Sequence, residues 1–444
     1  MPSDSEDFLV EHLLRRAAFG ATPEELKRYK SMGYNRTLKE LLHPEKVKDK
    51  QLDQMLADQN FDFTSIEDLK HWWLYRMIYT KRPLQEKMTL FWHGHFATSN
   101  KKVGNSYAMY MQNVLFRQNG MGNFRDLLLE TSKDPAMIVW LDNNSNNKGK
   151  PNENYAREIM ELFALGIGNY SEQDIKEGAR AFTGWQTKPN GFYFNPGQHD
   201  YGSKKFLGRT GNLNGDDVVE ILSEQPACPK FISMKLCKFF ASDNPSKTLV
   251  SDVAATYTGD GDNIRNMLTT LFQHDEFKSK ACYHAKIKSP VELVVGTIKS
   301  LQVQKLDNDL PNSMGRMGQT LLEPPNVKGW DGGPAWISTN TMMERFNFAT
   351  KITQAKFDAL ETFVKPAELV EQQQLQDPDQ MVDYFLNILT DGDVPEQARL
   401  ELRAYMTVSP KGDQVVLLSN DKVLDQKLRG LVHLIMTLPT YQLA

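Results

Sequence analysis

Hydrophobic and polar residues recur along most of the chain with the period of an α-helix, and the segment from Asn152 to Leu162 divides most sharply into two faces. At about 100° per residue, its apolar side chains fall on one arc of the helix. The opposite arc carries Glu153, Asn154, Arg157, Glu158 and Glu161. Glu153, Arg157 and Glu161 follow at every fourth position, so Arg157 is able to bridge both carboxylates. The pattern predicts an amphipathic helix whose charged face lies either in solvent, laced by ion pairs, or against a polar cleft.

The same period predicts helices along nearly the whole chain, and local signals mark where several of them begin. The segment from Thr22 to Glu25 combines a capping box with proline at the first helical position. Ser171 caps another predicted helix, with Asp174 at the box position. Pro83 opens a helix that we expect to run to about Phe96. From residue 216 onward the pattern is again helical.

One stretch, residues 186–215, departs from the helical pattern and looks β-like. Its aromatic run Phe192-Tyr193-Phe194 is followed by the turn residues Asn195-Pro196-Gly197. A small β-hairpin or an ordered loop insertion near residues 190–210 fits this pattern. We therefore predict a mainly α fold. It would be a single large multi-helical domain over residues 1–444, with most motifs in residues 1–185, a β-like insertion at 186–215 and a helical remainder at 216–444.

Two histidines, His93 and His95, lie at the end of the helix that Pro83 opens. On a regular helix they differ by about 200° and could not share a metal ion. If Gly94 ends the helix, His95 is freed and both imidazoles could converge on a divalent metal ion. The alternative is one core histidine bonded to backbone and one histidine that caps the C-terminus of the helix.

Two loops carry further candidate residues. In the β-like stretch His199 precedes Asp200, and aspartate is a common orienting partner of histidine. Adjacent residues on a loop can both point into a cleft, whereas in the alternative Asp200 only caps backbone amides of a turn. The second loop, residues 323–336, is rich in proline and glycine and holds Trp330 and Trp336. Large aromatic side chains on such a loop either fill the core or line a pocket.

Composition and charge narrow the classes of function. The 444 residues are 40% hydrophobic and 24% charged, which suits a packed globular core, and the formal net charge is -4. No basic stripe is visible, which argues against a dedicated nucleic-acid-binding protein. No apolar run approaches the roughly 18 residues of a membrane span, so we expect none. The cysteines Cys228, Cys237 and Cys282 form no disulfide framework, and we expect buried thiols rather than one bridge with a thiol left over.

Several motifs together resemble one family of bacterial proteins. The motifs are His12 to Gly20, Phe91 to Ser99, Asn152 to Gly166, Ala179 to Trp185, His199-Asp200 with Lys204, and Pro324 to Trp336 with Arg345. In this order, and over most of the chain, they are similar to the family catalogued as domain of unknown function 1800. The resemblance implies one large, mainly helical unit. Because these motifs combine charged residues with aromatic ones, it also favours the cleft-facing interpretation of the charged helix.

The same resemblance implies a location and a partner but no activity. Members of this family resemble exported bacterial proteins, so we expect a periplasmic or extracellular location. Their genes often lie beside another exported family that looks like sulfatases and alkaline phosphatases. Exported proteins usually begin with a signal peptide, and the N-terminus Met-Pro-Ser-Asp-Ser-Glu-Asp does not resemble one. A trimmed N-terminus would explain the difference.

The first functional hypothesis is an enzyme, a hydrolase or lyase that acts on an extracellular glycan or ester. Carboxylates held near each other or near histidines can divide the roles of acid and base between them. The residues expected to carry catalysis are Glu153, Arg157, Glu158, Glu161, Arg180, His199 and Asp200. Those expected to bind the substrate are Trp92, Trp185, Trp330, Trp336 and Arg345. In a metal-assisted variant, His93, His95 and one or two of the glutamates or Asp200 would hold a divalent metal ion that activates water.

The second hypothesis is a non-catalytic scaffold, or a partner of the exported sulfatase-like neighbour. The charged helix would then belong to a buried polar network that fixes the register of the helices. No standard catalytic motif directly supports the enzyme hypothesis, since the chain lacks His-Glu-x-x-His, Gly-x-Ser-x-Gly and a phosphate-binding loop.

Overall fold

The structure, a computed structural model, describes residues 5–258, 261, 263–303, 305–354, 363–408 and 421–444. Over these ranges it contains 24 α-helices, and its strands form two small antiparallel sheets of two strands each. The prediction of a mainly α fold is therefore confirmed.

The helices have the following bounds. The first group is α1 (Glu6–Ala17), α2 (Pro23–Met32), α3 (Tyr34–Leu42), α4 (Lys50–Gln59), α5 (Ile66–Tyr79), α6 (Pro83–His95), α7 (Asn100–Val103) and α8 (Ser106–Asn119). The second is α9 (Phe124–Lys133), α10 (Pro135–Trp140), α11 (Glu153–Glu158), the π-helical turn η3 (Ile159–Ala164), α12 (Glu172–Ala181) and α13 (Gly215–Glu224). The third is α14 (Ala227–Phe240), α15 (Lys247–Ala255), α16 (Asn263–Gln273), α17 (Asp275–Lys278), α18 (Pro290–Ser300) and α19 (Leu310–Arg316). The last is α20 (Thr339–Thr353), α21 (Pro366–Gln372), α22 (Pro378–Thr390), α23 (Glu396–Thr407) and α24 (Asp421–Thr437). Short 3₁₀ turns are η1 (Pro44–Lys46), η2 (Asn143–Ser145), η4 (Pro196–Gln198), η5 (Gly333–Ile337) and η7 (Thr440–Gln442).

The two capping boxes predicted from the sequence occur at the starts of helices in the structure. The Thr22 hydroxyl accepts a hydrogen bond from the Glu25 amide at 3.2 Å, and the Glu25 carboxylate accepts one from the Thr22 amide at 2.9 Å. Ser171 and Asp174 form the same reciprocal box at the start of α12. Each box satisfies backbone N–H groups that a helix start otherwise leaves without partners.

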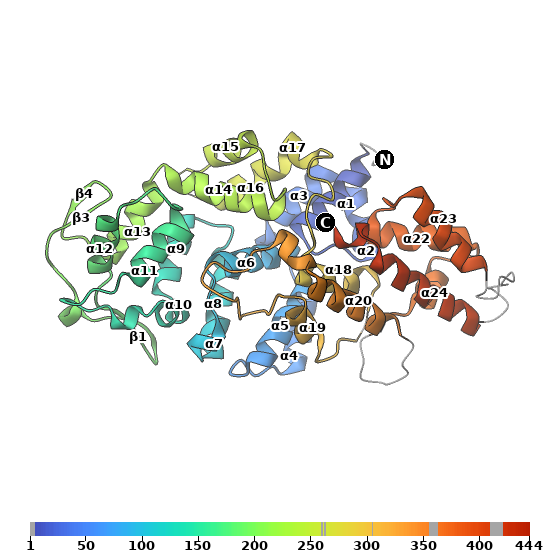
Figure 1. Cartoon of the computed structure of the whole chain (residues 1–444), viewed down its shortest axis with the longest axis horizontal. Coiled ribbons are helices and arrows are strands. Elements are labelled where there is room, and N and C mark those ends of the chain that lie inside the picture. Colours follow the sequence, from blue (N-terminus) through green and yellow to red (C-terminus); the bar gives the residue numbers. More distant parts are fainter. Residues whose placement is uncertain (1–4, 259–260, 262, 304, 355–362, 409–420) are drawn as a thin grey trace.

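The molecule is elongated, and helix α6 lies near its middle (Figure 1). Helices α9 to α13 and the strands form one end, and α21 to α24 form the other (Figure 1). Buried apolar side chains form two clusters, one from α1, α3, α6 and α9 to α16, the other from α5 and α18 to α24. Helix α6 contributes Phe91 and Trp92 to the first cluster and Leu90 to the second. Because α6 is surrounded on nearly every side, its polar side chains are buried as well.

Two buried ion pairs on α6 compensate for this burial. Glu86 accepts hydrogen bonds from Arg76 of α5 at 2.8 Å, from Arg117 of α8 at 2.7 Å and from the Trp73 indole at 3.2 Å. Burial raises the pKa of Glu86, but Arg117 and Arg76 outweigh burial and lower it to about 2. On the next residue, the Lys87 ammonium donates to Glu292 of α18 at 2.5 Å.

The β-like stretch forms two hairpins at the end of the molecule that holds α12 and α13 (Figure 1). Strand β1 (Trp185–Lys188) pairs with β2 (Gly191–Phe194), and β3 (Lys204–Phe206) pairs with β4 (Arg209–Gly211). The predicted insertion is confirmed, with a second hairpin beyond the single one expected.

The structure also bears on the cysteines and on membrane spans. Cys228, Cys237 and Cys282 are free and buried, as expected, and burial raises the pKa of Cys282 to about 11. Among the helices of the described ranges, none has the length and apolar composition that crossing a membrane requires.

Candidate functional site

The charged helix predicted from the sequence changes its winding halfway along. Helix α11 ends at Glu158, and the chain continues without interruption as the π-helical turn η3. At the end of this turn the Leu165 amide donates to the Met160 carbonyl at 2.9 Å, a bond over five residues instead of four. Single π-helical turns inside α-helices are rare and are frequent at functional sites.

The first half of the charged face is a solvated ion-pair network. Arg157 and Glu153 are each nearly 40% exposed, at 37% and 39%, and their closest charged atoms are 3.5 Å apart. Arg157 also donates two hydrogen bonds to Glu172 of α12, at 3.0 and 3.1 Å. The second carboxylate that Arg157 bridges is therefore Glu172, whereas the sequence pattern indicated Glu161.

The second half of the face is more enclosed. Glu158 and Glu161 are both partly buried, and Glu161 accepts a hydrogen bond from the Tyr170 hydroxyl at 2.9 Å. Burial and the neighbouring carboxylate of Glu161 raise the pKa of Glu158, while Arg157 and Lys328 act in the opposite direction. Burial and the bond to Glu161 raise the pKa of Tyr170 to about 12. Two carboxylates with different surroundings and a phenol thus lie together at η3, and Lys328 is close enough to oppose the rise in the pKa of Glu158.

The lysine of this group belongs to the proline- and glycine-rich loop, which lies against the end of α6. Gly329 packs so tightly on the Gly94 carbonyl that a Cβ atom on Gly329 would lie 2.3 Å from the carbonyl oxygen. The backbone amide of Leu322, just before the loop, donates to His93 Nε2 at 3.1 Å. The ring of Trp330 lies 5.6 Å from that of His93 and is partly exposed. His93 therefore helps to fix the loop that brings Lys328 towards Glu158.

His95 fixes the other side of the same region. Its Nε2 donates to the carbonyl of Phe163 in η3 at 2.9 Å, and its ring packs among Phe91, Trp92 and Phe96. Burial lowers the pKa of both histidines to about 3, so both rings are neutral at ordinary pH. The sequence left open that one of the two would be a core histidine bonded to backbone. In the structure both histidines have this role. Together they hold the loop and the π-helical turn to the two sides of α6.

The histidines were also the expected ligands of a divalent metal ion. Their bonded nitrogen atoms face different backbone segments, Leu322 for His93 and Phe163 for His95. Within the ranges that the structure describes, no three side chains of the types His, Cys, Asp or Glu gather closely enough to hold a metal. The metal-assisted variant therefore stays a prediction that elemental analysis can test.

We expect the folded chain to keep His95 neutral, with a measurable dependence of stability on pH. The pKa of His95 falls from 6.5 to about 3 on folding, so acid protonates the unfolded chain first. The contribution of neutral His95 is complete above about pH 6.5 and is lost progressively as the pH falls towards 3. Between about pH 7.5 and pH 5.5, the wild type should lose roughly 1.4 kcal/mol more unfolding free energy than His95→Phe does. Urea unfolding at both pH values measures this, and equal losses in the two proteins would contradict it.

The predicted pair His199 and Asp200 forms a separate cluster beside the hairpins. Asp200 accepts hydrogen bonds from Arg180 of α12 at 2.7 and 3.2 Å, which lower the pKa of Asp200 to about 2. His199 is buried and donates from Nδ1 to the Thr183 carbonyl at 2.8 Å. The Asp200 amide donates to the Thr183 hydroxyl at 2.8 Å. In this arrangement both residues tie the hairpins to the end of α12, and no hydrogen bond recorded for the described residues joins the imidazole to the Asp200 carboxylate.

Of the five side chains expected to bind the substrate, four are buried and one is partly exposed. Trp92, Trp185 and Trp336 are buried, and the indole of Trp92 donates to the Gly120 carbonyl at 2.7 Å. Arg345 is buried as well and donates to the carbonyls of Trp336 at 3.1 Å and Lys288 at 2.7 Å. These four side chains fill and fasten the interior. Trp330 is the one expected contact that reaches the surface, and its ring lies beside that of His93 near the end of α6.

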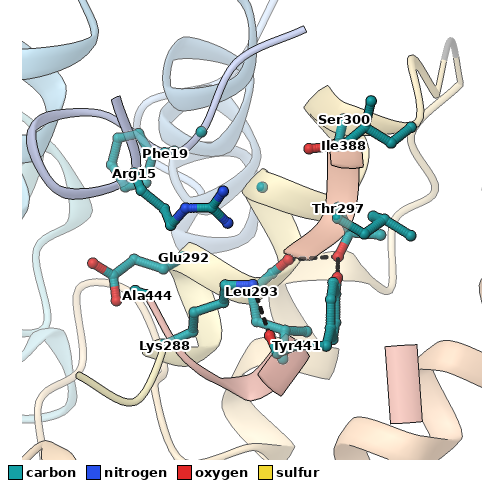
Figure 2. A pocket seen from close by; sticks show the side chains of 13 residues that line it. Arg15, Phe19, Lys288, Glu292, Leu293, Thr297, Ser300, Ile388, Tyr441 and Ala444 are labelled. Carbon is teal, nitrogen blue, oxygen red and sulfur yellow. Dashed lines mark hydrogen bonds between the residues drawn. The ribbon is translucent and has the colours of Figure 1, made fainter. Parts of the chain in front are cut away.

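The sequence reasoning missed a small cavity between α1, α18, α22 and the C-terminal segment (Figure 2). Its volume is about 40 Å³, and its charged lining residues are Arg15, Lys288 and Glu292. The Lys288 ammonium donates to the Tyr441 carbonyl at 2.6 Å, and Arg15 is paired with Asp391. Arg15 lies within the motif from His12 to Gly20, which was used only for the family resemblance. Lys288 and Tyr441 stand in no motif, and only the fold brings them to Arg15.

One comparison with known proteins identifies a family for this chain. Residues 12–443 match the family described as "Protein of unknown function (DUF1800)". No curated protein and no solved structure matches the chain. Because the match covers nearly the whole sequence, the chain belongs to the DUF1800 family of proteins of unknown function.

Proposed function

We propose that the protein is an enzyme, a hydrolase or lyase that acts on an extracellular glycan or ester with Glu158 and Glu161 as its acid–base pair. The observation that carries the proposal is a pair of partly buried carboxylates at a π-helical turn, of which Glu161 is bonded to Tyr170 and Glu158 has a raised pKa that Lys328 opposes. The proposal includes export to the periplasm or the cell exterior.

The two carboxylates have surroundings that suit different roles. Because the pKa of Glu158 is raised, Glu158 is the better proton donor, and it would protonate the oxygen of the leaving group. Glu161 would act as the base and take a proton from water while the water oxygen attacks the carbon of the scissile bond. In a lyase the same carboxylate would take a proton from carbon instead. Exchange of both protons with solvent then restores the starting state.

Neighbouring side chains supply charge and a binding surface. Tyr170 donates to Glu161, which holds this carboxylate in one orientation. Lys328 would stabilise negative charge that develops on the substrate. The partly exposed indole of Trp330 offers a flat apolar face of the kind on which sugar rings stack. His93 and His95 act through other residues in this scheme, since they fasten the loop and η3 to α6.

We expect a screen of glycans, esters and phosphate esters, with and without chelator, to reveal a turnover that depends on Glu158. Glu158→Gln removes the transferable proton and should lower kcat by at least about 100-fold with little change in Tm. Glu161→Gln should have an effect of similar size. Activity of the wild type should fall as the pH rises through the raised pKa of Glu158, because the acid then loses its proton.

The matched control is Glu172→Gln, which removes an exposed carboxylate that pairs with the same arginine. It should keep the activity of the wild type. Retention of full turnover by Glu158→Gln would refute the acid–base assignment.

The second candidate is a non-catalytic scaffold or a partner of an exported sulfatase-like protein. The observation in its favour is that the predicted residues His93, His95 and Arg345 are all bonded to backbone groups of the protein itself. Under this alternative no substrate is turned over, and Glu158→Gln mainly lowers Tm. The same screen and the same variant therefore discriminate between the two candidates.

A further inference from the structure

The cavity between α1, α18 and the C-terminal segment is surrounded by more positive than negative side chains. Lys288 lines the cavity and Arg345 binds the Lys288 carbonyl from behind the wall, and neither has a carboxylate within 4.0 Å among the residues that the structure describes. Their polar contacts go instead to uncharged oxygen atoms, such as the Tyr441 carbonyl for Lys288 and the Lys288 carbonyl for Arg345. Buried cations without a counter-ion are costly, so this surplus calls for an anion.

The two side-chain carboxylates nearby, those of Glu292 and Asp391, are already engaged. Glu292 gives one oxygen to the Lys87 ammonium at 2.5 Å and the other to the Ser289 amide at 2.7 Å. In Figure 2 its carboxylate points to the side, away from the amine of Lys288. Asp391 is paired with Arg15. Ala444 also lines the cavity, but its α-carboxylate forms no ion pair within 4.0 Å with any cation of the described ranges.

Two cationic groups with unused hydrogen-bond donors face this space. Figure 2 shows the guanidinium of Arg15 and the amine of Lys288 directed into the same volume. The Arg15 Nε atom is buried and has no hydrogen-bond partner. Lys288 has one bonded acceptor, the Tyr441 carbonyl, and an ammonium group has three protons to donate.

We propose that this cavity is a binding site for one compact monovalent anion, of the size of chloride or formate, held between Arg15 and Lys288. The size of the cavity fits such a ligand. One water needs at least about 10–15 Å³ of this kind of volume. The cavity, at about 40 Å³, therefore holds two or three waters or one small anion, and it is too small for a sugar or a nucleotide.

The bound anion would join three parts of the chain that are distant in sequence. Arg15 belongs to α1, Lys288 precedes α18, and Tyr441, which binds Lys288, belongs to η7. Without the anion, burial and the charges of Arg15 and Arg345 lower the pKa of Lys288 well below its usual value. An anion would counteract this and keep the lysine charged.

The test measures anion binding by the wild type directly. The protein is prepared in gluconate, and gluconate is replaced stepwise by chloride or formate at constant ionic strength. We expect a saturating rise in Tm of roughly 2–4 °C. We also expect broadening of the chloride-35 resonance that formate reverses. Citrate, which exceeds the cavity, should give neither effect.

Variants locate the site. Lys288→Met and Arg15→Gln should abolish the saturating rise in Tm, whereas Lys286→Met, which removes a nearby lysine paired with Asp243, should retain it. If Lys288→Met fails to fold, the chloride-35 titration of Arg15→Gln decides. Absence of saturable binding to the wild type, or binding that survives in Arg15→Gln, overturns the proposal.

Discussion

Glu86→Gln is expected to lower the free energy of unfolding by about 3–5 kcal/mol, because it leaves two arginines buried without a counter-charge. Glu86 is 1% exposed, and its carboxylate accepts from Arg76, Arg117 and the Trp73 indole at once. The amide of glutamine has one acceptor oxygen, and its NH₂ group would face a guanidinium. Urea unfolding at neutral pH measures the loss.

The ion pairs of Glu86 should also make the free energy of unfolding depend on pH in acid. The folded pKa of Glu86 is about 2, against 4.5 in the unfolded chain, so its contribution is present above about pH 4.5 and is lost as the pH falls towards 2. The difference between wild type and Glu86→Gln should therefore shrink over that range. Glu67→Gln is the matched control, since Glu67 is 53% exposed and its partner Lys70 also lies 3.6 Å from a second carboxylate, Glu323. A loss as small as the control's would show that the arginines find other partners.

Gly329→Ala is expected to destabilise the protein by about 2–4 kcal/mol and to displace the loop that carries Lys328 and Trp330. Two independent effects add at this position. The φ angle of Gly329 is +82°, which an L-residue adopts only with strain, and the new Cβ would lie 2.3 Å from the Gly94 carbonyl oxygen. That carbonyl belongs to helix α6 and cannot retreat, so the loop must move. Urea unfolding and the tryptophan fluorescence spectrum report the two consequences.

Gly208→Ala separates the two effects. Gly208 has a similar φ of +87°, but no heavy atom lies within 4 Å of the place that its new Cβ atom would take, so only the backbone strain of about 1–2 kcal/mol applies. If Gly329→Ala lowers the free energy of unfolding no more than this control does, the loop does not pack on α6 as closely as described. Under the proposed function, Gly329→Ala should also reduce turnover, since Lys328 and Trp330 leave the carboxylates.

The helices were accessible from the sequence because their signals are local. The capping boxes at Thr22 and Ser171 satisfy amides within the same turn, and the apolar stripe around Tyr155 and Ile159 repeats every three or four residues. The change from α to π winding after Glu158 was not visible, because a π-helical turn alters the hydrogen-bond pattern without changing the type of residue on either face.

The candidate site was predicted in part. The sequence singled out Glu158 and Glu161, which lie together at η3, and Trp330, which lies on the loop packed against α6. It also singled out His93 and His95, which fasten that loop and η3 to α6. It did not separate this group from the pair Arg180 and Asp200, whose cluster lies at the hairpins. Residue type and spacing are the same for a side chain that faces a cleft and for one that ties two elements together.

The sequence by itself determined where the helices begin, which arc of each is apolar, and that the fold is mainly α, since these depend on contacts within a few residues. Only the tertiary structure decided which polar faces are covered. The pKa of Glu158 responds to Lys328, which a loop from the second half of the chain brings near, and the cavity exists because α1 and the C-terminal segment close on Lys288. Burial, and the charge balance that follows from it, is a property of distant segments packed together, and no local pattern encodes it.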